Sequence, residues 1–202
     1  MPLSHKHKLI MVHIPKNAGT SIEICLGMEE SGHGDWEHYA EKFPSEWEEY
    51  RSFSVLRDPV DRFVSSYNYA TMENSYWHST DPSIDSEYGK HIDYDTCSKY
   101  DINELIAPWL AGDIELQHPS WCHQYTWIMK DNLVAVDYLA SFKNIADAIS
   151  ILVPSVKLDK INSSTSKRSD RLTDENKKLI EKYYDFDCDL YSQLNGHSLF
   201  TV

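Results

Sequence analysis

The chain has 202 residues, of which 41% are hydrophobic and 25% are charged, a composition typical of a globular protein rather than a disordered or fibrous one. Lysine and arginine number 19 against 32 aspartates and glutamates, so the net charge is −13. Such an acidic balance argues against a protein that binds nucleic acid or anionic membranes, because phosphate groups attract clustered positive charge.

The cysteine spacing and the hydropathy of the chain exclude further classes of protein. The four cysteines lie far apart and include no CxxC pair, so neither a disulfide scaffold nor a zinc ribbon is expected. The apolar run at residues 9–14 is too short for a signal-peptide core or a membrane span. We therefore expect a cytoplasmic protein with no membrane span.

Strands and helices are predicted in turn along the first third of the chain. Residues 8–14 form a continuous apolar run that ends at Pro15, which favours a strand buried on both faces. Residues 19–28 follow as a predicted helix, and residues 52–56 as a second short strand. Pro59 opens a further helical pattern, a position that suits the first turn of a helix.

The remaining segments are less regular. Residues 73–104 are predicted to be a polar, aromatic-rich insertion, and residues 133–142 to be a strand. Helices are predicted over 102–111, 121–129, 145–153 and 173–184. This order is typical of an α/β fold with a central parallel β-sheet flanked by helices. Without a repeat or a linker, we expect a single domain over residues 1–202.

The most informative segment is VHIPKNAGTSI, at residues 12–22. A buried strand leads into a loop that holds Lys16, Asn17 and Gly19, and Thr20 and Ser21 stand at the start of the helix that follows. Free amides of a helix N-terminus, two hydroxyls and an ammonium then meet at one place, which favours a phosphate-like anion. The lysine precedes the glycine, unlike the GxxxxGK[ST] loop of nucleotide triphosphatases. The alternative is a polar turn with an ordinary helix cap.

A second segment, VLRDPVDRFVSSY at residues 55–67, has related features. Arg57 ends a predicted strand, and Ser65 lies two turns into the following helix. Both side chains can reach a second phosphate, the arginine through its forked pair of donors. The alternative is a surface Arg–Asp pair beside a solvated helix, which contributes little stability.

Together the two segments resemble a known family. IPKNAGTSI followed by LRDPVDRFVSSY is similar to the sulfotransferases that use 3′-phosphoadenosine 5′-phosphosulfate (PAPS), in the branch that contains carbohydrate O-sulfotransferases. QYTWI at 124–128, the segment 136–144, NSS at 162–164 and the closing YYDFDCDLYSQL also resemble that family. The chain departs from it at Lys143, where the family usually has a glutamate. Most members that modify glycans carry a membrane anchor, which we do not expect here.

The resemblance implies a P-loop-like domain and a reaction. A sulfuryl group would pass by in-line displacement from PAPS to an acceptor hydroxyl, leaving adenosine 3′,5′-bisphosphate. In the family the first loop binds the 5′-phosphosulfate and the second binds the 3′-phosphate. The implied donor-binding residues are Pro15, Lys16, Asn17, Ala18, Gly19, Thr20, Ser21, Arg57 and Ser65. Lys16 is the expected catalytic cation at the leaving oxygen, and the scheme requires no metal.

The attacking hydroxyl needs a general base. Members of the family commonly place a histidine or glutamate between the two loops, so His33 in SGHGDW is the first candidate and His38 the second. His13 is expected to pack beneath the first loop. Lys167 and Arg168 fall where the family has a loop that closes over the nucleotide, and they are candidates for donor contacts; the alternative is a solvated basic turn.

Local charge suggests what the acceptor is. Residues 29–49 and the 73–104 insertion, which we expect on the acceptor side of the site, are both strongly acidic and would repel a polyanionic substrate. We therefore expect a neutral or cationic acceptor that bears a hydroxyl, either a small molecule or a carbohydrate. Tyr67, Gln124 and Trp127 are candidates to border it. The alternative is that the acidic residues form a solvated face.

Two other functions remain open from the sequence. A domain that binds adenosine bisphosphate without catalysis would keep the donor loops but lose the transfer step. A small-molecule kinase would also place a lysine and a helix N-terminus at a phosphate. The kinase is disfavoured because the chain has no GK[ST] loop and no evident magnesium-binding aspartate after a strand.

Overall fold

The computed structural model describes residues 2–29, 32–75, 78, 83, 89–158, 172–194 and 197–202. The chain packs as two compact units, one made of residues 1–58, 122–166 and 186–202 and the other of residues 59–121 and 167–185. Two packing units can belong to one domain, so the expected single domain stays a prediction.

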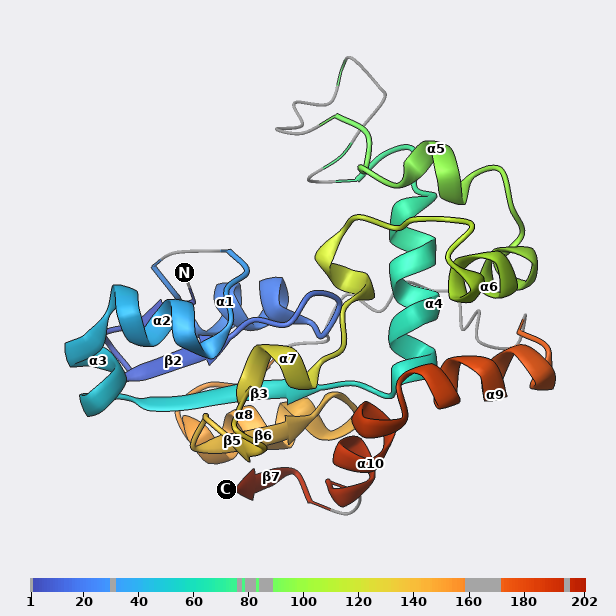
Figure 1. The fold of residues 1–202 in the computed structure, drawn as a ribbon. Coiled ribbons are helices and arrows are strands. Elements are labelled where there is room, and N and C mark those ends of the chain that lie inside the picture. Colours follow the sequence, from blue (N-terminus) through green and yellow to red (C-terminus); the bar gives the residue numbers. More distant parts are fainter. Residues whose placement is uncertain are drawn as a thin grey trace. The chain divides into compact units, whose positions relative to one another are not determined.

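The first unit is built on a five-stranded sheet in the order β1-β2-β3-β6-β7 (Figure 1). Its strands are β1 (Leu3–Ser4), β2 (Leu9–Val12), β3 (Arg51–Leu56), β6 (Tyr138–Ser141) and β7 (Leu199–Thr201). The three central strands β2, β3 and β6 are parallel, and the short outer strands β1 and β7 pair antiparallel to them. The predicted α/β fold with a largely parallel central sheet is confirmed.

Both faces of this sheet are buried, because alternate residues of each central strand enter different cores. Ile10 and Val12 of β2 belong to one apolar cluster, whereas Leu9 and Met11 belong to another. The first cluster is completed from α2 (Trp36–Lys42), α7 (Tyr125–Ile128) and α10 (Asp185–Gln193). The second is completed from α1 (Gly19–Leu26) and α8 (Ile145–Leu152). Helices therefore cover both faces, as a parallel sheet requires.

The remaining elements of the first unit are short. The helix α3 (Pro44–Glu49) packs Trp47 against the first cluster, and the 3-10 turn η2 (Phe142–Asn144) leads into α8. The strands β4 (Met129–Lys130) and β5 (Leu133–Val134) form a two-residue hairpin whose turn residues, Asp131 and Asn132, have positive φ. The predicted single strand over 133–142 was therefore wrong, since the hairpin occupies its beginning and only β6 joins the main sheet.

The second unit is helical. It contains α4 (Pro59–Ala70), α5 (Tyr94–Cys97), α6 (Ile102–Ala111), the 3-10 turn η1 (Pro119–Trp121) and α9 (Asp174–Tyr183). Its core includes Phe63, Leu105, Trp121 and Ile180. The predicted helices after Pro59, over 102–111 and over 173–184 are confirmed. Part of the 73–104 segment lies outside the described residues, and its acceptor role stays a prediction.

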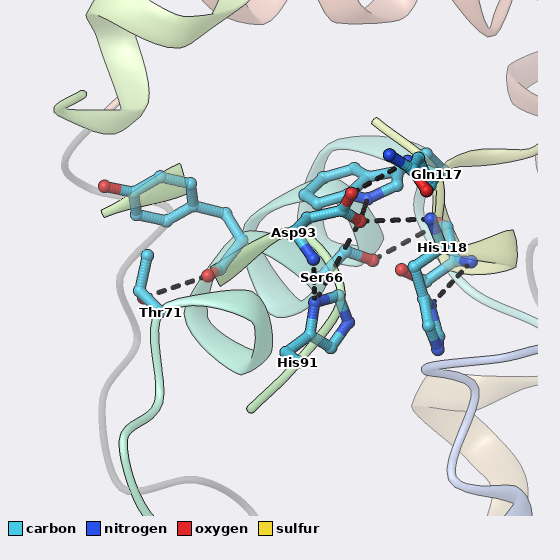
Figure 2. Close-up of polar contacts among 9 residues, drawn as sticks. Ser66, Thr71, His91, Asp93, Gln117 and His118 are labelled. Carbon is cyan, nitrogen blue, oxygen red and sulfur yellow. Dashed lines mark hydrogen bonds and ion pairs between the residues drawn. The ribbon is translucent and has the colours of Figure 1, made fainter. Parts of the chain in front are cut away.

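One buried carboxylate organises the loops of this helical unit (Figure 2). Asp93 accepts hydrogen bonds from the backbone N–H of Gln117 at 2.8 Å and of His118 at 3.0 Å, and from the indole Nε1 of Trp121 at 2.8 Å. Its own N–H donates to Nδ1 of His91. These bonds tie the segment before α5 to the segment before η1, so Asp93 has a structural role here.

Among the described residues, no helix combines the length and the apolar character needed to cross a bilayer.

Candidate active site

The first candidate loop connects β2 to α1 and has an unusual backbone. Lys16 and Ala18 have positive φ values of 72° and 66°, and Asn17 lies between them with negative φ. Non-glycine residues rarely adopt this conformation, and it is concentrated at functional sites. The N–H of Asn17, between them, donates to the carbonyl oxygen of Ile14 at 3.3 Å, so the loop is closed by a tight backbone turn.

The first turn of α1 adds to this site. No side chain caps the helix at Ala18, and the first turn contains no acidic residue. The N–H groups of that turn therefore keep the positive end of the helix open to an anion. The predicted hydroxyls stand here, Thr20 exposed and Ser21 half-buried.

Gly19 is required because His13 packs directly against it. A Cβ atom at Gly19 would lie 1.9 Å from Nε2 of His13. The His13 side chain is only 7% exposed, and its Nδ1 lies 2.7 Å from Oε1 of Glu23, which is also buried. His13 therefore packs beneath the loop, as expected, and Glu23 is a partner that the sequence did not reveal.

Two cations meet at the loop. Nη1 of Arg57 donates to the carbonyl oxygen of Lys16 at 3.0 Å, and the guanidinium lies 4.4 Å from the centre of the Phe142 ring. Burial, together with the positive charge of Arg57, lowers the pKa of Lys16 to about 8. Because like charges at close range oppose each other, this arrangement favours an anion that neutralises both.

The parallel sheet explains why these residues meet. β2 and β3 are adjacent and parallel, so the loops that follow them begin at the same edge of the sheet. Asn17 of the first loop is buried, and its Nδ2 donates to the carbonyl of Val55 at 2.6 Å. Its Oδ1 is buried without a hydrogen-bond partner in the part of the chain that the structure describes.

Gln124 lies under both loops rather than at their surface. Its side chain is buried, and its amide contacts Asn17 and the backbone of Arg57. The sequence predicted that Gln124 borders the acceptor. In the structure its amide makes hydrogen bonds to both loops, and the predicted contact with the acceptor stays a prediction.

His33 has the geometry of a general base. Its Nδ1 lies 3.1 Å from the carbonyl oxygen of His13, and since a carbonyl only accepts, Nδ1 carries the proton. Nε2 is then left with its lone pair. Desolvation by neighbouring groups and the proximity of His13, whose ring centre is 4.2 Å away, lower the pKa of His33 to about 4. The imidazole is therefore neutral at physiological pH.

His38, the second candidate base, lies on the exposed side of α2. Its backbone N–H donates to Oδ1 of Asp35, the cap of that helix, and its ring contacts Tyr39 edge-on. A catalytic role for His38 stays a prediction, with less geometric support than His33 has.

The other predicted residues are dispersed. Pro15 is buried in the first loop, and Trp127 is half-buried with its ring centre 6.4 Å from that of His33. Ser65 and Tyr67 lie on α4 in the helical unit, where the Tyr67 hydroxyl donates to the carbonyl of Tyr100 at 2.7 Å. Their predicted contacts with donor and acceptor stay predictions. Lys167 and Arg168 lie outside the described residues.

Asp187 is a supporting residue that sequence reasoning missed. Its buried carboxylate, on α10, accepts the backbone N–H of Gln124 at 2.7 Å and of Tyr125 at 2.9 Å. The sequence shows only that an aspartate lies in the closing YYDFDCDLYSQL segment. The neighbouring residues do not indicate that it is buried or that it binds the backbone at residues 124 and 125. Among the described residues, no group of three or more histidine, cysteine, aspartate or glutamate side chains is arranged to hold a metal ion.

Comparison with known proteins gave one match. A family model described as the sulfotransferase family matches residues 2–192, a span that includes both candidate loops, His33 and Asp187. No match was found among curated proteins or among solved structures.

Proposed function

Because the chain belongs to the sulfotransferase family, we propose that it transfers a sulfuryl group from PAPS to the hydroxyl of an acceptor. Family membership supports a sulfotransferase enzyme, and the identity of donor and acceptor is the proposal. The observation that carries it is the meeting of Lys16 and Arg57 at the uncapped N-terminus of α1. A cationic site of this kind suits a ligand with more than one phosphate-like group.

The residues present fit such a donor. The ammonium of Lys16 and the first-turn amides of α1 would hold the 5′-phosphosulfate, and the guanidinium of Arg57 would hold the 3′-phosphate. When bound, PAPS supplies a sulfuryl group that is activated by its bond to a phosphate leaving group. Lys16 stabilises the negative charge that grows on the leaving oxygen, because a preset cation is most effective where charge develops.

His33 supplies the proton transfer. Its Nε2 accepts the proton of the acceptor hydroxyl while the hydroxyl oxygen forms its bond to sulfur and the bond from sulfur to the leaving phosphate breaks. The imidazole then releases the proton to water, and the ring returns to its neutral form. No metal enters this scheme.

We propose a neutral or cationic acceptor, either a small molecule or a carbohydrate. The helix α2, which begins three residues after His33, carries two exposed glutamates, Glu37 and Glu41. Negative charge near the base raises the concentration of cations and repels polyanions. An acceptor that is heavily sulfated or rich in carboxylates is therefore disfavoured.

The first test is a calorimetric titration with adenosine 3′,5′-bisphosphate, with adenosine 5′-monophosphate and magnesium-ATP as controls. We expect the bisphosphate to bind most tightly, and Arg57→Ala to weaken it at least tenfold through the lost contact to a phosphate. A preference for magnesium-ATP would contradict the proposal and favour a kinase. Loss of sulfate transfer in Lys16→Met separates an enzyme from a domain that only binds the nucleotide.

A further inference from the structure

The side chain of Gln124 joins the two candidate loops. Its Oε1 accepts hydrogen bonds from Nδ2 of Asn17 at 2.7 Å and from the backbone N–H of Arg57 at 3.0 Å. Its Nε2 donates to the carbonyl oxygen of Arg57 at 2.9 Å. One planar amide thus holds the loop after β2 through a side chain and the loop after β3 through both of its backbone groups.

Gln124 is itself held in place. Its backbone N–H donates to Asp187, whose second carboxylate oxygen accepts the next N–H, that of Tyr125. Both Gln124 and Asp187 are 1% exposed. Hydrogen bonds in such a dry environment resist exchange with water, so the amide has a defined position relative to α10.

We propose that Gln124 is a positioning residue that sets the spacing between the two anion subsites, and that this spacing gives the site its preference for a 3′,5′-bisphosphate over a 5′-monophosphate. The inference rests on the proposed function. Lys16 and Arg57 belong to separate loops, so a ligand that engages both needs the loops at a fixed separation. A ligand with one phosphate has no such requirement.

Glutamine suits this task because it offers an acceptor and a donor in one plane. Methionine has nearly the same length and volume but offers neither, so Gln124→Met keeps the packing and removes the three side-chain hydrogen bonds. Glutamate would be a poorer probe, since its charge would oppose anions at both subsites.

The test compares two dissociation constants in each variant. Adenosine 3′,5′-bisphosphate and adenosine 5′-monophosphate are titrated against the wild-type protein and Gln124→Met. We expect the bisphosphate to bind about tenfold or more weakly to the variant, because small misplacements of binding groups have large effects. The monophosphate should change less than about threefold, since it does not depend on the spacing.

A matched control separates positioning from general loss of stability. Ser52 is buried on β3 at the end away from the loops, and its hydroxyl exchanges hydrogen bonds with Asp137. Ser52→Ala should lower the midpoint of thermal unfolding and leave the ratio of the two dissociation constants unchanged. If Gln124→Met does not fold, Asp187→Asn gives the same test, because it loosens the backbone anchor of Gln124. This variant should also reduce the preference for the bisphosphate over the monophosphate.

The outcomes are distinct. Equal weakening of both nucleotides, or no weakening of either, would overturn the role of Gln124 while leaving the proposed function intact. A wild-type protein that does not prefer the bisphosphate would overturn the proposed function, and with it the inference. A selective loss of the bisphosphate in the variant supports both.

Discussion

At the scale of single residues, the proposed chemistry depends most on Lys16. Its ammonium lies in a loop of unusual backbone conformation, close to a second cation, and its pKa is lowered to about 8. Burial of a lysine beside an arginine opposes folding, and only a ligand that carries negative charge relieves it. The same contacts that weaken the empty protein therefore strengthen its complex with an anion.

This lowered pKa predicts a pH dependence of binding. Above pH 8 the free protein loses the Lys16 proton, whereas the bound anion favours the charged form, so binding takes up a proton. The affinity for adenosine 3′,5′-bisphosphate should fall as the pH rises from about 7 to about 9.5, and calorimetry in buffers of different ionisation enthalpy measures the uptake. Lys16→Arg should bind with little pH dependence in this range, since arginine stays protonated. Uptake that persists in Lys16→Arg would assign the proton to another group.

The same shift predicts how stability varies with pH. The folded-state pKa lies below the ordinary value of 10.5, so between about pH 8 and pH 10.5 the unfolded chain binds more protons at this position. The free energy of unfolding should therefore gain from Lys16 as the pH rises through that window. Lys16→Met should be more stable at pH 7 by about 1–2 kcal/mol and lack this gain. Denaturant titrations at pH 7 and pH 9.5 measure both effects.

His33 gives a second prediction at this scale. His33→Gln should lower kcat by about 10²–10⁴-fold and leave the affinity for the bisphosphate unchanged, because it removes the proton acceptor and not an anion contact. Since the pKa of His33 is about 4, its protonation should not reduce the rate between pH 7 and pH 5.5 as an ordinary histidine would. Steady-state kinetics of His33→Gln and His38→Gln compare the two candidates. A larger loss in His38→Gln would reverse their order.

At the scale of elements, α1 is the helix that the site depends on. Its N-terminus is uncapped, and its first residue packs against the ring of His13. The helix can therefore face an anion only while that ring and the loop backbone stay in contact. Its other end is an ordinary αL cap at Gly27, where an added side chain would meet nothing.

The two glycines of α1 make a matched pair of tests. Gly19→Ala should destabilise the protein by about 2–4 kcal/mol and remove bisphosphate binding, because the new methyl group overlaps the His13 ring. Gly27→Ala should cost only about 1 kcal/mol, for its positive φ, and leave binding unchanged. Thermal unfolding and a bisphosphate titration check both variants. Binding retained in Gly19→Ala would show that the loop can relax around the histidine.

The sequence predicted the helices, the strands and the two candidate loops better than the residues that support those loops. β2, β3 and α4 were predicted well because each follows one continuous local pattern, and the two anion loops are contiguous motifs. The support beneath the loops could not be predicted in this way. Gln124 lies 107 residues from Asn17, and Asp187 lies 63 residues from Gln124, so only the folded chain brings them together. The hairpin at β4 and β5 was missed because its turn uses Asp131 and Asn132 without glycine.

At the scale of the whole molecule, the positive charge of the candidate site contrasts with the negative net charge of the chain. The chain carries a net charge of −13, yet Lys16 and Arg57 meet at one edge of the sheet. The positive potential of such a site acts on a small anion at close range, while the remaining acidic surface repels large anions. This distribution supports the proposal of a small anionic donor together with an acceptor that is not itself polyanionic.

This distribution predicts which acceptors react. In a sulfate-transfer assay, neutral or cationic hydroxyl compounds should be modified, and a heavily sulfated glycan should not, because it is repelled at low ionic strength. Added salt should weaken donor binding and reduce the discrimination between acceptors. Turnover of the sulfated glycan alone would contradict the proposed acceptor class and leave the donor site standing.

The bond from Nδ1 of His33 to the carbonyl of His13 has a consequence for how the enzyme can change over time. The anchor is the backbone carbonyl of His13, directly after β2, so a side-chain replacement at residue 13 does not remove the acceptor atom itself. The proposed base is thus oriented by the main chain that leads from β2 into the first loop. Under the proposed mechanism, substitutions elsewhere in the chain can change which acceptors react without removing the contact that orients the proposed base.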